Sequence, residues 1–387
     1  MGIGLLFSAC IAFAQVSSPS VTEPVVPAPR SGSIGPMIPA GINPLTGQEA
    51  PPEALARLPM IVKISNSPPV VRPQYGLGEA DLVFEHYTEV GITRFSSIFL
   101  GNAPQRVGSV RSARLIDYEL APMYDALLAF AGASLGVDKR IYGTEHVVAQ
   151  VCRGRDDADQ CRQDVMNIGP AGDIPPSDFV ARAFKGTYYG PPLFVRDEAI
   201  PMPHNMFADT QAIWARAARQ GISSTANLDG MVFHPQPPPN PEGRGIYAQV
   251  RYATTLAEWH YEPESGRYYR STDGIPHFDA LTDEQISAAN VIVLYAGHYL
   301  TDIVESGGGE NVHWSEQITL WPQGRGVLLR DGQRYELVWR RPQRSDLLTF
   351  WREDGITPLE LKPGNTFFQV VRLPEQMNPD VEWVIVD

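Results

Sequence analysis

The segment Gly108-Ser109-Val110-Arg111-Ser112-Ala113-Arg114 holds the residues with the clearest chemical potential. Ser109 is a residue type that caps helices, so we expect a helix to begin there, with Arg111 and Arg114 on one face of its first turn. Two cations at this end oppose the helix dipole, at a cost of about 0.3–1 kcal/mol each. Free backbone N–H groups and two guanidinium groups would together hold a phosphate or a carboxylate. The segment therefore predicts an anion-binding site.

Internal pairing is the alternative for these arginines. Asp81, Glu85 and Glu89 follow one another at even spacing around a predicted strand, so their side chains share a face if the strand persists. They could bind a cation or take part in acid–base chemistry, which makes Asp81 and Glu85 candidate catalytic residues. They could also pair internally, which is the simpler interpretation, with Arg94, Arg111 and Arg114. The residues alone leave both possibilities open, and we predict no metal site.

Polar residues in two loops complete the predicted site. His204 and Asn205 follow Pro203 just before a predicted helix, and His204 could act as a general base. A histidine in a loop is more often a structural hydrogen-bonding residue, so this role is also left open. Asn66 and Arg72 lie in the polar loop after the first predicted strand, and such loops often line sites. The predicted ligand-binding residues are Asn66, Arg72, Arg94, Arg111, Arg114 and Asn205.

Familiar catalytic motifs are missing from the sequence. There is no phosphate-binding P-loop, no GxGxxG after a strand, no GxSxG elbow and no HExxH. The sequence therefore names neither a cofactor nor a reaction. Its net charge of -13 also disfavours non-specific binding to nucleic acid, which depends on neutralising phosphates. We expect no nucleic-acid partner.

The first residues predict export. Residues 1–14 form an apolar run too short to span a bilayer, and Ala12-Phe13-Ala14 has the pattern of a signal-peptidase site. An imperfect lipobox, Leu6 to Cys10, offers a second interpretation, with cleavage before Cys10 and a lipid on its thiol. Residues 15–41, rich in proline, serine and valine, then form a tether. We expect an extracytoplasmic protein, secreted or lipid-anchored, that meets the membrane only through this anchor.

Two cysteines remain beyond Cys10. Cys152 and Cys161 flank a polar stretch that suits an exposed loop. A disulfide between them in an oxidising compartment would contribute about 2–3 kcal/mol of stability. Two free thiols are the alternative, and the spacing does not favour a zinc site.

The folded part is expected to be α+β, with two mixed α/β domains. A proline-rich linker, residues 231–245, separates an N-terminal domain at 42–230, a mixed sheet with helices, from a strand-rich C-terminal domain at 246–387. The predicted elements of the first domain are strands at 60–64, 82–87, 92–100 and 127–131 and a helix at 209–220. Those of the second are hairpins that turn at 264–266 and 331–332 and strands at 291–295 and 366–371.

Several motifs along the chain resemble the YerB-like family of bacterial lipoproteins. They span about residues 42 to 375 in order. Those of the N-terminal part are Asn43-Pro44-Leu45-Thr46-Gly47, Asn66-Ser67-Pro68, Arg72-Pro73-Gln74-Tyr75-Gly76-Leu77, Ala80-Asp81, Gly91-Ile92-Thr93-Arg94-Phe95, the 108–114 segment and Pro203-His204-Asn205. Those of the C-terminal part are Pro276-His277-Phe278-Asp279, Asn290-Val291, Gly326-Val327 and Trp339. The poor lipobox and Ser65, where the family usually has aspartate, are departures. The resemblance implies an envelope lipoprotein of no established activity.

Three functions are compatible with the sequence. The leading hypothesis is a binding protein for an anionic envelope polymer or a lipid-linked glycan, held by the arginine cluster. The rival is a phosphotransferase or hydrolase acting on a lipid-linked glycan, with Asp81 and Glu85 on a divalent cation and His204 as base. It rests on a likeness in layout to the LytR-CpsA-Psr phosphotransferases, which is an analogy only. A purely structural or partner-binding envelope lipoprotein is the third, and it predicts internally paired arginines.

Overall fold

The computed structural model describes residues 38–222, 227–308 and 311–387. The predicted signal peptide, Cys10 and most of the predicted tether lie outside these residues. No helix in the described ranges combines the length and the hydropathy needed to cross a membrane.

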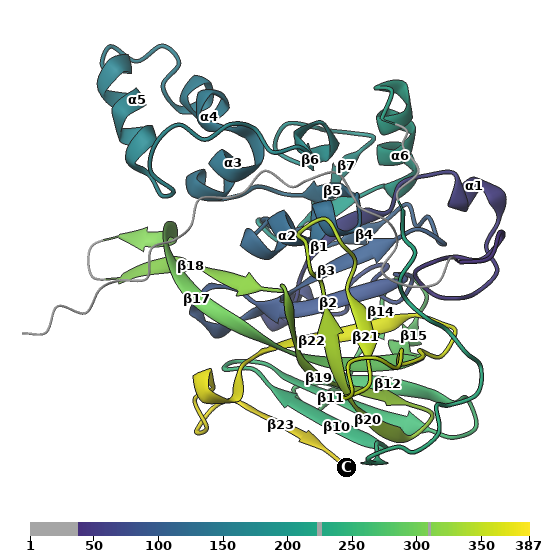
Figure 1. Cartoon of the computed structure of the whole chain (residues 1–387). Coiled ribbons are helices and arrows are strands. Elements are labelled where there is room, and N and C mark those ends of the chain that lie inside the picture. Colours follow the sequence, from purple (N-terminus) through teal and green to yellow (C-terminus); the bar gives the residue numbers. More distant parts are fainter. Residues whose placement is uncertain (1–37, 223–226, 309–310) are drawn as a thin grey trace, which may run out of the picture.

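A single mixed sheet forms the centre of the molecule (Figure 1). Its path through the hydrogen-bonded strands is β21-β20-β19-β17-β22-β2-β3-β1-β5-β6. The N-terminal half contributes β1 (Met60–Ser65), β2 (Leu82–Tyr87), β3 (Thr93–Phe99), β5 (Leu127–Phe130) and β6 (Ala183–Lys185). The C-terminal half contributes β17 (Asn290–Gly308), β19 (Gln323–Arg330), β20 (Gln333–Arg340), β21 (Thr349–Trp351) and β22 (Thr366–Arg372).

The two halves meet at β22. This strand pairs in parallel with β2 on one side, from Leu82 opposite Thr366 to Glu85 opposite Gln369, and with β17 on the other side. Backbone hydrogen bonds therefore run without a break from one half of the chain to the other.

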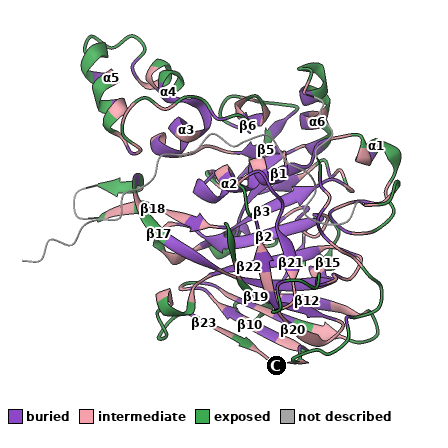
Figure 2. Cartoon of the chain, viewed as in Figure 1, coloured by how far each residue is buried: buried purple, intermediate pink, exposed green. Residues whose placement is uncertain are grey.

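Both faces of the central sheet are buried, as Figure 2 shows for its inner strands. Successive side chains of a strand point to opposite faces, so Ile61 and Phe84 enter one core while Val62 and Val83 enter the other. Strands buried on both sides read as continuous apolar runs, which is why β1 and β5 were recognisable in the sequence.

A second sheet covers one face of the central sheet. It contains β10 (Tyr247–Arg251), β11 (Leu256–Glu262), β12 (Arg267–Thr272), β13 (Ile275–Pro276), β16 (Ser287–Ala288) and β23 (Trp383–Val386). Trp259 of β11 is fully buried and packs against Phe367 of β22, with ring centroids 4.9 Å apart. Two further strands belong to the central sheet, β18 (Asn311–Thr319) beside β17 and β9 (Gly243–Arg244) beside β20. The remaining short strands are β4 (Val107–Gly108), β7 (Phe194–Arg196), β8 (Met206–Ala208), β14 (Phe278–Asp279) and β15 (Glu284–Gln285).

Helices gather mainly at the opposite end of the molecule from β10 and β23 (Figure 1). They are α1 (Pro52–Leu55), α2 (Leu115–Met123), α3 (Leu135–Tyr142), α4 (Thr144–Val151), α5 (Ala158–Asn167) and α6 (Thr210–Arg219). Residues of α2 and α3 enter the same core as Ile61 and Phe84. The start of α6 follows the sequence prediction, because the Asp209 side chain accepts a hydrogen bond from the Ala212 N–H.

The structure contains the predicted disulfide between Cys152 and Cys161. Cys152, at the end of α4, is bonded to Cys161 of α5, with their Cα atoms 5.8 Å apart. Both cysteines belong to a small satellite core with Val147 and Val165. The bond therefore fixes two helices that contribute little to the main core.

Candidate functional site

The arginine-bearing segment is a strand-like extension, and this corrects the predicted helix start. The Arg111 N–H donates to the Lys63 carbonyl, and the Arg111 carbonyl accepts from the Ala131 N–H, both at 2.9 Å. The segment thus inserts between the C-terminal end of β1 and the chain that follows β5. Helix α2 begins only at Leu115, with Arg114 at its N-cap. The backbone groups that a helix beginning at Ser109 would need are used in sheet hydrogen bonds instead.

Two of the three arginines are neutralised from within. Arg114 donates to both carboxylate oxygens of Glu89, the Nε bond being 2.7 Å long, and its Nε lies 3.3 Å from Glu305. Arg94 lies 3.6 Å from Glu89 and donates to the Ser112 carbonyl at 2.8 Å. Both guanidinium groups are buried. This is the internal pairing that the sequence offered as the alternative.

Crowding of charge shifts the pKa values in this cluster. Burial, followed by the charge of Arg114, lowers the pKa of Arg94 to about 9. Burial acts to raise the pKa of Glu89, but hydrogen bonding to Arg114 and the charges of Arg114 and Arg94 outweigh it and lower that pKa to about 2. Burial raises the pKa of Glu305. The cluster therefore holds three cations against two carboxylates, one of which ionises reluctantly.

Arg111 is the unneutralised member of the cluster. Among the described residues, no carboxylate lies within 4 Å of it, and its guanidinium makes one long hydrogen bond of 3.3 Å, from Nη1 to the Pro203 carbonyl. Its buried Nε has no partner there, and neither do the Ser109 hydroxyl and the His204 Nδ1. An unsatisfied buried polar group costs about 1–3 kcal/mol, so three around one segment call for an explanation.

His204 is electrostatically coupled to Arg111. Burial and then the positive charge of Arg111 lower the pKa of His204 below its usual range. The imidazole is therefore neutral near pH 7, and an anion bound beside Arg111 would reverse this effect. Of the three candidate catalytic residues, His204 is the one that lies at the arginine cluster.

A fully buried network lies beneath the cluster, and the sequence analysis did not identify it. The Lys63 ammonium contacts His86 Nε2 at 2.6 Å, the Ser96 hydroxyl at 2.9 Å and the Asp117 carboxylate at 2.9 Å. Burial lowers the pKa of Lys63 to about 8, although Asp117 opposes the shift. A lysine in the middle of the apolar run Met60-Ile61-Val62-Lys63-Ile64 was the available signal. The network positions α2, because Asp117 also accepts from the Arg114 N–H.

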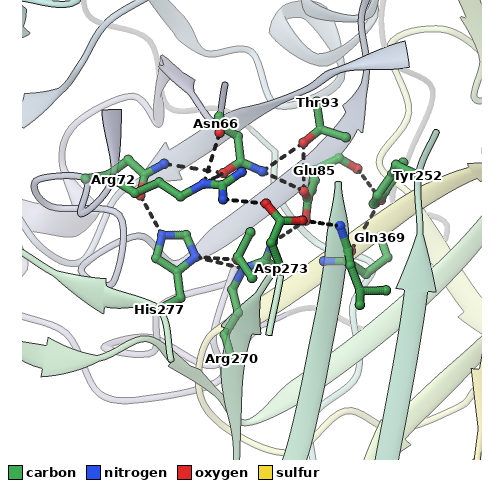
Figure 3. A network of polar contacts seen from close by, with 12 residues as sticks. Asn66, Arg72, Glu85, Thr93, Tyr252, Arg270, Asp273, His277 and Gln369 are labelled. Carbon is green, nitrogen blue, oxygen red and sulfur yellow. Dashed lines mark hydrogen bonds and ion pairs between the residues drawn. The ribbon is translucent and has the colours of Figure 1, made fainter. Parts of the chain in front are cut away.

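Asn66, Arg72 and Glu85 belong to a different network (Figure 3). It lies on the other face of the sheet. Neighbouring residues of a strand point to opposite faces, so Glu85 turns away from the face that His86 and Arg94 share. The Glu85 carboxylate pairs with Arg270 of β12 at 2.8 Å, both side chains having no solvent exposure, and accepts from Asn66 at 3.0 Å. Arg72 pairs with Asp273 at 2.6 Å.

This second network joins the two halves of the chain, and its buried side-chain atoms without a partner among the described residues are Arg270 Nη1 and Gln369 Nε2. Gln74 accepts from His277 Nε2 at 2.5 Å, while His277 Nδ1 accepts from Arg270 Nε at 3.1 Å. Arg270 of the C-terminal half thus reaches Glu85 of the N-terminal half inside the protein. We interpret these contacts as a structural lock, meaning that they hold the two halves of the chain together, and we name them the inter-half network.

The last two predicted residues lie apart from both networks. Asp81 accepts from the Leu100 and Gly101 N–H groups, at 2.5 and 3.0 Å, and from Asn43 at 2.6 Å. Asn205 accepts from Arg196 at 2.7 Å. The described residues contain no group of three or more His, Cys, Asp or Glu side chains placed to hold a metal ion.

Comparisons with known proteins agree with this architecture. Residues 45–223 match a family model described as the N-terminal domain of a protein of unknown function, DUF3048, and residues 248–368 match its C-terminal domain. A relative named "Putative lipoprotein YerB", from Bacillus subtilis (strain 168), is 27% identical over 332 residues, which are 85% of each chain. The crystal structure of the YerB protein from Bacillus subtilis superposes with a TM-score of 0.66 at 25% identity, and covers 89% of this chain and 99% of that one.

Proposed function

This chain belongs to the DUF3048 family, and we propose that it is a cell-envelope binding protein for ligands that carry a phosphate or another compact anionic group. The anion would lie on Arg111, with His204 and the Ser109 hydroxyl beside it. Arg94 and Arg114 would supply positive potential from within the protein without touching the ligand.

One observation carries this proposal. Arg111 has a half-buried guanidinium with a single long hydrogen bond and an unpartnered Nε, next to two arginines that already have their carboxylates. A guanidinium can donate five hydrogen bonds in a planar fork that matches phosphate and carboxylate geometry. An anion at this position would accept hydrogen bonds from the exposed donors of Arg111. It would also neutralise the local excess of positive charge.

The proposed location in the cell envelope has separate support. The relative from Bacillus subtilis is named as a lipoprotein, the apolar run at the start of this sequence predicts export, and the imperfect lipobox within it offers the same kind of anchor. A disulfide between Cys152 and Cys161 also suits an oxidising compartment outside the cytoplasm.

Calorimetric titration of the purified chain with inorganic phosphate and with poly(glycerol phosphate) tests the proposal. We expect binding that weakens as salt rises, and a loss of about 10- to 100-fold for Arg111→Ala, the range for a hydrogen bond to a charged group. Arg155→Ala is the matched control, because it removes the same charge from an exposed arginine paired with Asp157. Equal binding by the wild type and Arg111→Ala would refute the proposal.

A further inference from the structure

A second polar cluster lies at the same end of the sheet as Arg111 and takes no part in the network around it. Asp138 of α3 and Lys185 of β6 form a buried ion pair of 2.5 Å. Three aromatic rings surround this pair. Tyr142 stacks on His146 with centroids 4.7 Å apart, and Tyr188 lies 5.7 Å from Tyr142.

The cluster contains one acceptor and one donor that are buried and have no hydrogen-bond partner in the described part of the chain. Asp138 Oδ1 and the Tyr142 hydroxyl are both buried, and neither has a hydrogen-bond partner among the described residues. The pKa of Tyr142 is raised by burial and then by the charge of Asp138, so its phenol stays protonated and able to donate. The cluster can thus accept one hydrogen bond and donate another to a third group.

The rim of the cluster is aromatic and open to solvent. Tyr188 is 40% exposed, and the Lys185 ammonium lies 4.6 Å from the centroid of its ring. The Tyr188 hydroxyl contacts His146 Nε2 at 3.0 Å and donates to Gln150 at 2.7 Å, both from the exposed side of α4. Aromatic rings around a few fixed polar groups are typical of small-molecule sites.

Backbone pairing sets the spacing between this cluster and Arg111. The Arg111 carbonyl accepts from the Ala131 N–H, and the Ala131 carbonyl accepts from the Thr187 N–H. Adjacent paired segments lie about 4.8 Å apart, so the backbones at Arg111 and Thr187 are roughly 10 Å apart. Val110 and Phe184 enter the core on the second-sheet side, so their neighbours Arg111 and Lys185 project toward the opposite face, where α3 lies.

We propose that the ligand of this protein is a phosphorylated sugar, with its phosphate on Arg111 and its sugar ring on the cluster of Asp138, Tyr142, Lys185 and Tyr188. The phosphate half of this inference rests on the proposed function. Sugar hydroxyls both donate and accept, which matches the unpartnered phenol and carboxylate oxygen, and the apolar face of a pyranose packs on an aromatic ring such as Tyr188. Both sets of side chains project from the same face of the sheet, from backbones about 10 Å apart, as one ligand that contacts both requires.

Titration of the full chain with inorganic phosphate, N-acetylglucosamine 1-phosphate and glucose 1-phosphate tests the inference. We expect at least one sugar phosphate to bind about 10-fold or more tightly than inorganic phosphate, which is 1.4 kcal/mol. Tyr188→Ala should abolish this gain and leave the affinity for inorganic phosphate unchanged. Tyr299→Ala is the matched control, since it removes a tyrosine that is 54% exposed on β17.

The possible outcomes separate the two proposals. If inorganic phosphate binds through Arg111 but neither sugar phosphate binds more tightly, the sugar subsite is refuted and the anion site stands. A sugar-phosphate gain that survives Tyr188→Ala also refutes the subsite, and a water molecule between Asp138 and Tyr142 then explains their unmatched atoms. If neither phosphate nor a sugar phosphate binds, the proposed function itself fails.

Discussion

The inter-half network and the arginine cluster lie on opposite faces of the same strands and differ in how their charged side chains are paired. Glu85 and Arg270, on one face, are fully buried and paired with each other, while Asn66 donates a hydrogen bond to Glu85 and Arg270 donates one to His277. Arg111, on the other face, has no carboxylate within 4 Å among the described residues and has a cationic neighbour, Arg114. The difference indicates that one region stabilises the fold while the other keeps unused binding capacity. Each prediction below tests this division.

The largest expected effect is loss of stability on breaking the inter-half network. Arg270→Ala leaves the Glu85 carboxylate buried without its cation, and such a change costs about 3–5 kcal/mol. Urea denaturation measures it. Arg155→Ala, which breaks an exposed pair with Asp157 outside the network, should cost less than about 1 kcal/mol. Similar losses for both variants would show that the network is not a lock.

Acid should weaken the arginine cluster through Glu89. Its pKa is lowered to about 2 from 4.5 in the folded protein, so its contribution to stability is present above about pH 4.5 and is lost as the pH falls toward 2. The contribution is on the order of 3 kcal/mol. Denaturation of Glu89→Gln and wild type at pH 7 and at pH 3 should give a difference that shrinks with acid. A constant difference would contradict the ion pairing.

Removing Arg111 should leave stability almost unchanged. Its guanidinium contributes one long hydrogen bond and repels Arg114, so Arg111→Ala should shift the unfolding free energy by less than about 0.5 kcal/mol in either direction. The same variant is expected to lose anion binding. A loss of several kcal/mol would instead place Arg111 with Arg270 among the structural residues.

The smallest expected effect is a pH dependence of anion binding through His204. Anion binding beside Arg111 should raise the lowered pKa of His204, so affinity should increase as the pH falls and the imidazole of the bound state takes up a proton. Sulfate is the appropriate probe because it does not itself titrate in this range. His204→Gln should remove the dependence while the wild type retains it, and a pH profile shared by both proteins would exclude His204 from the site.

Local pattern was enough to predict much of the secondary structure. The hairpin that turns at Asp331 and Gly332 and the start of α6 at Asp209 follow the predictions, because each depends on residues close together in sequence. The helix expected at Ser109 was wrong, because contacts with Lys63 and Ala131 override the capping preference of one serine.

Contacts between residues far apart in the sequence limited how much of the site could be predicted. The sequence suggested Glu89 as a partner for the arginines, and the structure pairs it with Arg94 and Arg114. Glu305 was missed, since it belongs to a long strand far along the chain and no local pattern links it to Arg114. Asn66 and Arg72 were placed in the predicted site because they lie in a loop after a strand, yet they contact Glu85 and Asp273.

The placement of β22 between β2 and β17 has a practical consequence for dissecting this protein. A fragment ending near residue 230 would present the bare edge of β2, from Leu82 to Glu85, to the surrounding water. Such an edge invites association with other chains, so separately expressed halves should aggregate. A proteolytic nick between residues 231 and 245 would be tolerated instead, since both pieces would stay clasped along the shared strands and copurify as one body.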